Sequence, residues 1–380
     1  MRNEDIKNLK QPVEVGNYFE SEKAFKKAIG VSTPNTDLLV DEVAQDLDQR
    51  TNGIQWWMNL PLHERILISD YLYQSITTID TNLVEAKLHF LEWLDTRDHQ
   101  NQRIANAVFL DSRGDLSVKT PAFTSPYDHV PHRLQDLHLA GFLRSIGSTL
   151  DCLAATIVAV LGLPNKMRRS GIGNTLDRLQ KVDKTLGAGA ELQANFYTFF
   201  VEARNSCGPN DWLDWADQYR NVFVHRGRRI VYQELTQRKP IILDTSARPL
   251  IRTDEISHLP KYPDRSEIEA FIKSKDVVLN ENAEITLSGI LNSTCTLVEK
   301  VSIELRRIWL IRRQSPLLIE QPIAQWSDLP KQCSFTGYDT NAKQLEMDVL
   351  ISNPMVRFRM EMGAVTDSQR HHWSGSELEN

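Results

Sequence analysis

The chain has 380 residues, of which 41% are hydrophobic and 25% are charged, a composition typical of water-soluble globular proteins. At about 150 residues per domain, this length allows two or three domains. The formal net charge of −6 excludes a protein that is basic overall, so an anionic partner such as nucleic acid would have to meet a local basic patch.

The sequence shows no pattern typical of export, membrane insertion or disulfide bonding. Residues 1–27 are charged and lack the apolar core of a signal peptide. The longest apolar run, 152–163, is shorter than the about 20 residues that cross a bilayer, which favours a buried core helix. The four cysteines are far apart and form no CxxC pair, which fits a reducing compartment. We therefore expect a cytoplasmic protein without a membrane segment.

The first third of the chain is predicted to be a flexible arm followed by helices. Residues 1–36 are polar and predict a flexible N-terminal arm. Residues 37–131 form an N-terminal helical region, because apolar residues recur every three or four positions. Within this region, the apolar segments 108–110 and 116–118 flank a polar turn and predict a short hairpin.

The central region, residues 132–235, is predicted to be entirely helical apart from its last residues. Its first helix carries an apolar stripe that is ended by Gly162 and Pro164. The predicted helices cover residues 132–163, 174–186, 190–205 and 211–226.

The remaining third of the chain alternates between loop-like and helical patterns. Residues 236–264 contain four prolines and predict a long loop or insertion. Residues 265–315 hold two predicted C-terminal helices, of which 282–313 has the cleaner apolar face. Residues 316–380 predict a small β element and a disordered tail. The fold class expected is therefore mostly α-helical, with a small C-terminal β element.

The predicted helix 211–226 carries the residues best suited to chemistry. At about 100° per residue, its aromatic residues share one face, while Asn221 and His225 lie on the other and Arg220 flanks it. Arginine forks onto phosphate oxygens, and histidine exchanges a proton near neutral pH. The alternative is a solvated helix end, because the helix dipole alone favours basic residues there.

Two segments of this region resemble a known family. Arg220-Asn221 followed by His225 resembles the R-x(4–6)-H signature of the HEPN domain, and Arg226-Gly227 after the histidine is similar to several bacterial HEPN families. The segment 143–154 resembles the helix that precedes this signature. Its polar residues that share one face are Arg144, Ser148 and Asp151. The resemblance covers about residues 132–235.

This resemblance implies a fold, an activity and a set of roles. The family fold is an up-and-down helical bundle, which here would have flanking helices. The family activity is metal-independent endoribonuclease cleavage at the interface of a homodimer, of bacterial toxin or anti-phage type, without a cofactor. Arg220 would hold the scissile phosphate, His225 would act as acid or base, and Asn221 would orient His225 or the phosphate.

The resemblance also implies supporting residues and partners. Asp151 would fix Arg220 or tune His225, with Arg144 and Ser148 facing the same cleft. Positive charge for RNA binding would come from Arg226, Arg228 and Arg229. An antitoxin or sensor protein is a further expected partner. The alternative is a non-catalytic bundle that dimerises and binds RNA, nucleotide or a partner protein.

Two further basic clusters admit two interpretations each. Both could be solvated surface or could guide RNA. The first, at the end of the last predicted helix, comprises Arg306, Arg307, Arg312 and Arg313. The second comprises Lys166, Arg168 and Arg169. A possible metal pair, His129 and His132, lies in a proline-rich segment without an obvious further ligand, which favours a surface loop.

Overall fold

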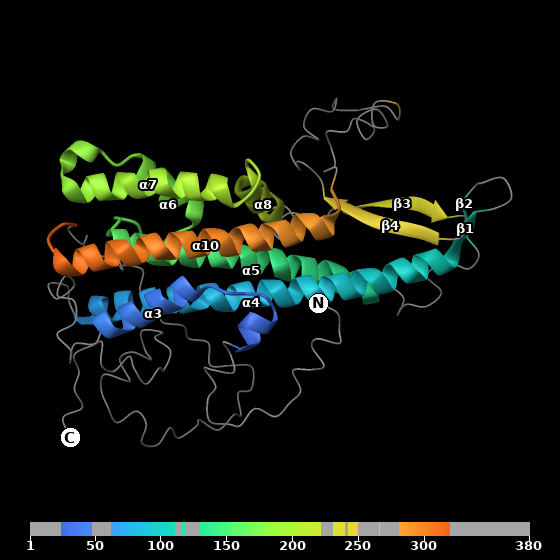
Figure 1. Ribbon diagram of the computed structural model, residues 1–380, viewed down its shortest axis with the longest axis horizontal. Helices are drawn as coiled ribbons and strands as arrows, with labels where there is room; N and C mark the ends of the chain where they lie inside the picture. The colour runs from blue at the N-terminus through green and yellow to red at the C-terminus, as the bar shows by residue number, and fades with distance from the viewer. Residues whose placement is uncertain are drawn as a thin grey trace, which may run out of the picture. The chain divides into compact units, whose positions relative to one another are not determined.

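The computed structural model of the protein describes residues 24–47, 62–110, 116–118, 130–221, 231–239, 242–249, 266 and 281–319. These residues are mostly α-helical and have the character of a helical bundle, which confirms the expected fold class at this level (Figure 1). The helices are α3 (Pro34–Leu47), α4 (Leu62–Ala107), α5 (Val130–Leu161), α6 (Ile172–Gln180), α7 (Ala188–Cys207), α8 (Trp212–Asn221) and α10 (Ala283–Gln314). The strands are β1 (Val108–Leu110), β2 (Leu116–Val118), β3 (Val231–Lys239) and β4 (Ile242–Pro249).

The strands form two separate antiparallel hairpins. β1 pairs with β2, with Val108 opposite Val118, where the sequence predicts a hairpin. β3 pairs with β4, with a register irregularity between Gln237 and Lys239. This second hairpin crosses the predicted boundary at residue 235. Of the two alternatives for residues 236–264, a long loop or an insertion, the loop is wrong for residues 236–239 and 242–249.

The chain divides into two compact units. The described residues of unit 1 lie within 1–32, 81–149 and 203–297, and those of unit 2 lie within 33–80, 150–202 and 298–380. The division falls inside α4, α5, α7 and α10, so each unit contains part of each of these helices.

The long helices bury apolar residues at the three- and four-residue steps that one helix face requires. On α10 the buried residues are Ala283, Leu287, Ile290, Leu291, Leu297, Val298, Val301, Leu305, Ile308 and Trp309. On α5, residues 153–161 are buried on every side. Arg133–Leu161 is long and apolar enough to cross a membrane by length and composition, yet 78% of its most apolar window is buried inside the protein. Because each fully buried large apolar side chain contributes about 1.5–3 kcal/mol, these faces dominate the stability of both units.

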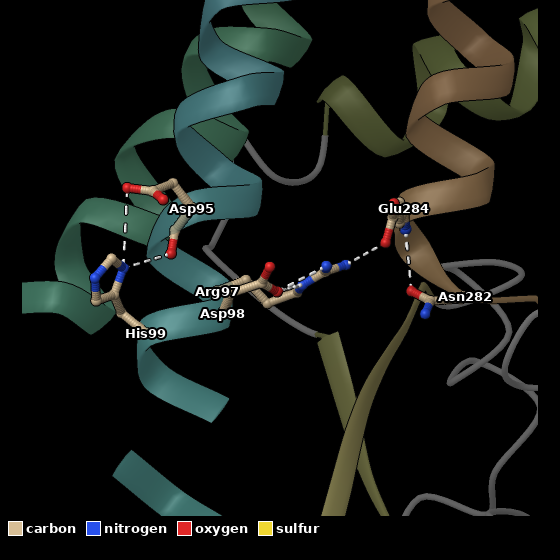
Figure 2. A network of polar contacts seen from close by, with 6 residues as sticks. All are labelled: Asp95, Arg97, Asp98, His99, Asn282 and Glu284. Carbon is tan, nitrogen blue, oxygen red and sulfur yellow. Dashed lines mark hydrogen bonds and ion pairs between the residues drawn. The ribbon is translucent and has the colours of Figure 1, made fainter. Parts of the chain in front are cut away.

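In unit 1, polar contacts fix α4 against α5 and α10. The Nδ1 atoms of His89 on α4 and His138 on α5 share a hydrogen bond of 3.2 Å. The His89 ring covers Gly141, where a Cβ atom would lie 2.5 Å from Cε1. Figure 2 shows Arg97 of α4 reaching Glu284 in the first turn of α10, with 2.9 Å between Nη1 and Oε2.

The start of α10 is capped by its own residues. Asn282 Oδ1 accepts a hydrogen bond from the backbone N–H of Glu284 at 3.1 Å (Figure 2). A side-chain oxygen in this position satisfies one of the N–H groups that a helix start leaves without an intrahelical partner. The sequence boundary of this helix, 282–313, therefore agrees with the structure to within one residue.

In unit 2, α3 is held against α10 by a row of polar contacts. Thr36 shares a hydrogen bond of 3.0 Å with Ser302. Buried Asp46 accepts a hydrogen bond from Trp309 Nε1 at 2.7 Å and pairs with Arg313 at 3.2 Å. Burial raises the pKa of Asp46, although these two partners act in the opposite direction.

Arg312 joins the end of α5 to the end of α10 within unit 2. Its guanidinium is fully buried and donates to the carbonyls of Val160 at 2.7 Å and Ala159 at 3.2 Å. These carbonyls belong to the last turn of α5, whose C=O groups have no intrahelical donor. Burial lowers the pKa of Arg312 to about 9, so the side chain remains charged at neutral pH.

Two predicted segment boundaries are corrected by the structure. The predicted flexible arm 1–36 is wrong for its last residues, because Ile29 and Val31 are buried and α3 already begins at Pro34. The predicted helix 174–186 is shorter: α6 ends at Gln180, and Lys184–Leu186 forms a separate 3-10 turn. The predicted β element and tail cover residues 316–380, and from residue 320 onward this segment lies outside the described residues.

Candidate functional site

The candidate site is built on α8, whose start is anchored by three contacts in unit 1. Asp211, with φ of 60°, adopts the left-handed conformation that Asp tolerates better than most residues, and its carbonyl accepts from Trp215 N–H at 2.9 Å. Trp212 Nε1 donates to the carbonyl of Arg204 on α7 at 3.1 Å. Ser293 of α10 donates to the carbonyl of Cys207 at 2.8 Å. The direction in which α8 leaves the turn is therefore fixed by α7 and α10.

One face of α8 is buried and sets the rotation of the helix. Its buried residues are Trp212, Leu213, Ala216 and Tyr219. The rings of Trp215 and Tyr219 stack with 4.8 Å between centroids. Burial, and to a lesser degree the Asp136 carboxylate, raises the pKa of the Tyr219 phenol. The helical wheel correctly places the described aromatic residues on the packed face, and Leu213 is buried as well.

Arg220 lies against α5 at Gly147. A Cβ atom at Gly147 would lie 2.6 Å from Arg220 Cζ and 2.7 Å from Cδ, closer than real Cβ contacts come. The guanidinium therefore occupies space that only glycine leaves open. Since Gly147 lies between Arg144 and Ser148 in the chain, the structure brings Arg220 to the turn of α5 that carries these two predicted residues.

Asp217 holds the two described signature residues. Its Oδ1 pairs with Arg220 Nη1 at 3.4 Å, and its Oδ2 accepts from Asn221 Nδ2 at 3.1 Å. One carboxylate thus contacts the arginine three positions on and the amide four positions on, as helical neighbours do. The sequence interpretation gives Asp217 no role. Its spacing to Arg220 and Asn221 is the signal that could have done so.

The predicted supporting residues on α5 differ in their surroundings. Arg144 is exposed and Ser148 is half-buried, both in unit 1. Asp151 is half-buried and belongs to unit 2, where its Oδ1 would lie 3.5 Å from a Cβ atom at Gly171. Asp151 therefore neighbours the start of α6, and its predicted role toward Arg220 or His225 stays a prediction.

The remaining predicted site residues lie outside the described residues. These are His225 and the predicted RNA-binding residues Arg226, Arg228 and Arg229. Their roles stay predictions. Among the residues that the structure describes, no group of three or more His, Cys, Asp or Glu side chains has an arrangement that could hold a metal ion.

The basic cluster at the end of α10 is only in part the solvated helix end that the first interpretation expects, because the side chains of Arg307 and Arg313 are 51% and 39% exposed whereas Arg312 is buried. Arg306 pairs with Glu42, and Arg313 pairs with Asp46 at 3.2 Å. Arg307 pairs with Glu304 on its own helix, and Arg312 is buried. Carboxylates and backbone carbonyls of the described chain thus already occupy all four guanidinium groups.

Comparison of the chain with protein-family models, with curated proteins and with solved structures returned no match. The candidate site is therefore defined by the residues themselves: Arg220 packed on Gly147, and Asp217 bound to both Arg220 and Asn221.

Proposed function

We propose that the protein is a metal-independent endoribonuclease of the HEPN type, which cleaves RNA at a site shared by two copies of the chain. Arg220, Asn221 and His225 would form the catalytic set of each copy, and α8 would face its counterpart across the dimer axis. Such an enzyme would belong to the toxin or anti-phage class, with an antitoxin or sensor partner controlling access to the site.

The contact between Arg220 and Gly147 is the observation that supports this function best. A guanidinium that binds a scissile phosphate must be held in one position before substrate arrives, because a fixed charge costs no reorganisation during the reaction. Arg220 packs on Gly147 and pairs with Asp217, and these two contacts restrict its position. The side chain of Arg220 nevertheless remains 23% exposed, so a phosphate oxygen can reach it.

The proposed chemistry follows from these residue types. The ribose 2′-oxygen would attack the adjacent phosphorus as its proton passes to His225, and the bond from phosphorus to the 5′-oxygen would break. The leaving oxygen would take a proton from His225 of the partner subunit. Arg220 would stabilise the negative charge that develops on the phosphate oxygens. The products are a 2′,3′-cyclic phosphate and a 5′-hydroxyl end.

The test is incubation of the purified full-length protein with total RNA in the presence of EDTA, followed by analysis of the RNA ends. Cyclic-phosphate ends are expected from the wild type and not from Arg220→Ala or His225→Ala. Arg133→Ala, which removes an exposed arginine of α5, is the matched control and should cleave normally. Undiminished cleavage by both site variants would overturn the proposal. Binding of RNA without any product would instead favour the non-catalytic bundle.

A further inference from the structure

A basic cleft lies in unit 2, away in sequence from the signature residues. It has a volume of about 470 Å³, within the range of about 300–1,000 Å³ typical of small-molecule sites. Its lining includes the cations Lys166, Arg169, Arg178 and Lys181 and the single carboxylate Asp177. Four positive charges against one negative charge converge here on a chain whose formal net charge is −6.

The first wall of the cleft is a tight, hydrogen-bonded turn. Arg169 N–H donates to the carbonyl of Lys166 at 3.0 Å, and Ser170 Oγ donates to the same carbonyl at 2.8 Å. Met167 inside the turn is buried and anchors it to the protein. Lys166 and Arg169 are therefore carried by a backbone that is already in place before any ligand binds.

The second wall is the polar face of α6. Thr175 and Leu179 are buried and fix the rotation of the helix. Asn174, Arg178 and Lys181 follow one another at four- and three-residue steps, so they share one exposed face. The side chains of Arg178 and Lys181 form no hydrogen bond or ion pair with any other residue that the structure describes. Their charges are available to an anion.

We propose that this cleft binds a small anion with several adjacent phosphate groups, of the di- or triphosphate class. Arginine forks and lysine ammonium groups are the side chains that recognise phosphate, and four of them in one concavity match a ligand with several negative charges. Asn165 and Asn174 add neutral hydrogen-bond donors. The cleft would bind this ligand whether or not the protein cleaves RNA.

The lining also indicates which part of the ligand is recognised. None of the described residues that line the cleft is aromatic. Single-stranded RNA is usually held by bases stacked on aromatic side chains, in addition to contacts with its backbone. The cleft therefore reads phosphate groups and not bases, and nucleotides with different bases should bind alike.

Calorimetric titration of the full-length protein with sodium tripolyphosphate, in the presence of EDTA, tests the proposal. Tripolyphosphate, ATP and GTP should bind with similar affinity, and inorganic phosphate should bind more weakly. The double variant Arg178→Gln/Lys181→Gln should weaken tripolyphosphate binding by at least about tenfold, because each lost charge-assisted hydrogen bond costs about that much. Both residues are exposed, so the fold should be retained, as circular dichroism can verify.

The control is Arg133→Gln/Arg307→Gln, which removes the same charge from exposed positions outside the cleft. It should bind tripolyphosphate as the wild type does. Equal weakening by both double variants would mean that net charge alone attracts the anion, and would overturn the proposal. Absence of tripolyphosphate binding to the wild type would also overturn the proposal. A third contrary outcome is that the cleft variant loses more affinity for a short single-stranded RNA than for tripolyphosphate.

Discussion

The guanidinium end of Arg220 packs over the backbone of Gly147, a position of α5 where any larger residue would collide with it. The obstructed atoms belong to the flexible end of a side chain, so a substitution at Gly147 would move Arg220 more than it would disturb the helices. The position of Arg220 and the stability of the fold can therefore be changed separately.

Gly147→Ala should impair RNA cleavage while leaving the protein folded. Alanine favours a helix over glycine by about 1 kcal/mol, which offsets part of the cost of the collision. Displacement of Arg220 by about 1 Å should lower the cleavage rate on the order of a hundredfold. Gly289→Ala in α10, where a Cβ atom meets nothing within 4 Å, is the control and should cleave normally.

The same pair of residues can be tested without an activity assay. In an Arg220→Ala background the collision is absent, so Gly147→Ala should be stabilising there and less favourable in the wild type. A double-mutant cycle of unfolding free energies measures this coupling. Additive effects on the free energy of unfolding would show that Arg220 does not contact position 147 in solution.

Asp217→Asn should lower the rate of RNA cleavage clearly, while it lowers the free energy of unfolding only slightly. The substitution removes the charge that holds Arg220 and alters the acceptor of Asn221. Because Asp217 is 44% exposed, its ion pair should contribute no more than about 1 kcal/mol to folding. Cleavage rates and thermal unfolding of the variant provide the comparison.

Asp214→Asn is the matched control for this substitution. Asp214 lies on the same helix and pairs with Arg204 at 3.7 Å, not with Arg220 or Asn221. We expect normal cleavage from this variant. If both substitutions lowered the rate equally, the effect would come from the charge of α8 and not from the position of Arg220.

The sequence predicted the helices and the packed face of α8 because both depend on local periodicity. The stripe of α10 places its boundaries to within one residue, and the aromatic residues of α8 mark its buried side. The hairpin of β3 and β4 was missed because β3 is mostly polar and lacks an apolar alternation. Only pairing between strands defines such an element.

The burial of Arg312 was missed for a different reason. Its position follows Val301, Leu305 and Ile308 at four-, three- and four-residue steps, on the face that is buried. A basic residue in the last turn of a helix is ordinarily solvated, and this expectation outweighed the periodicity. The carbonyls that accept hydrogen bonds from buried Arg312 lie at the end of α5, about 150 residues earlier in the chain. A local sequence pattern cannot reveal such a distant contact.

Arg312→Ala should destabilise the protein by about 3 kcal/mol, because it removes the donor that Arg312 supplies to the buried carbonyl of Val160, removes one of the two donors to the carbonyl of Ala159, and opens a cavity. Arg307→Ala, five residues earlier on α10, removes an arginine that is 51% exposed and should cost less than about 1 kcal/mol. Urea unfolding of both variants gives the comparison. Similar losses would mean that Arg312 is solvated in solution.

His89 should make the stability of the protein depend on pH below about 6.5. Burial, and next the neighbouring His138, lower the pKa of His89 from its usual value of 6.5, while Glu85 and Glu92 act in the opposite direction. The unfolded chain therefore binds the proton more readily than the folded protein. The contribution of His89 is fully present above pH 6.5 and is lost as the pH falls through that value toward the lower folded-state pKa.

His89→Gln should flatten the part of the pH profile that arises from this histidine. Unfolding free energies in urea, measured between about pH 7 and pH 5, would show a smaller loss for the variant than for the wild type. His99→Gln is the control, because His99 is 69% exposed and, among the residues that the structure describes, bonds within its own helix to Asp95 (Figure 2). Parallel profiles for the wild type and His89→Gln would show that protonation of His89 is not opposed by its burial against Gly141 and His138.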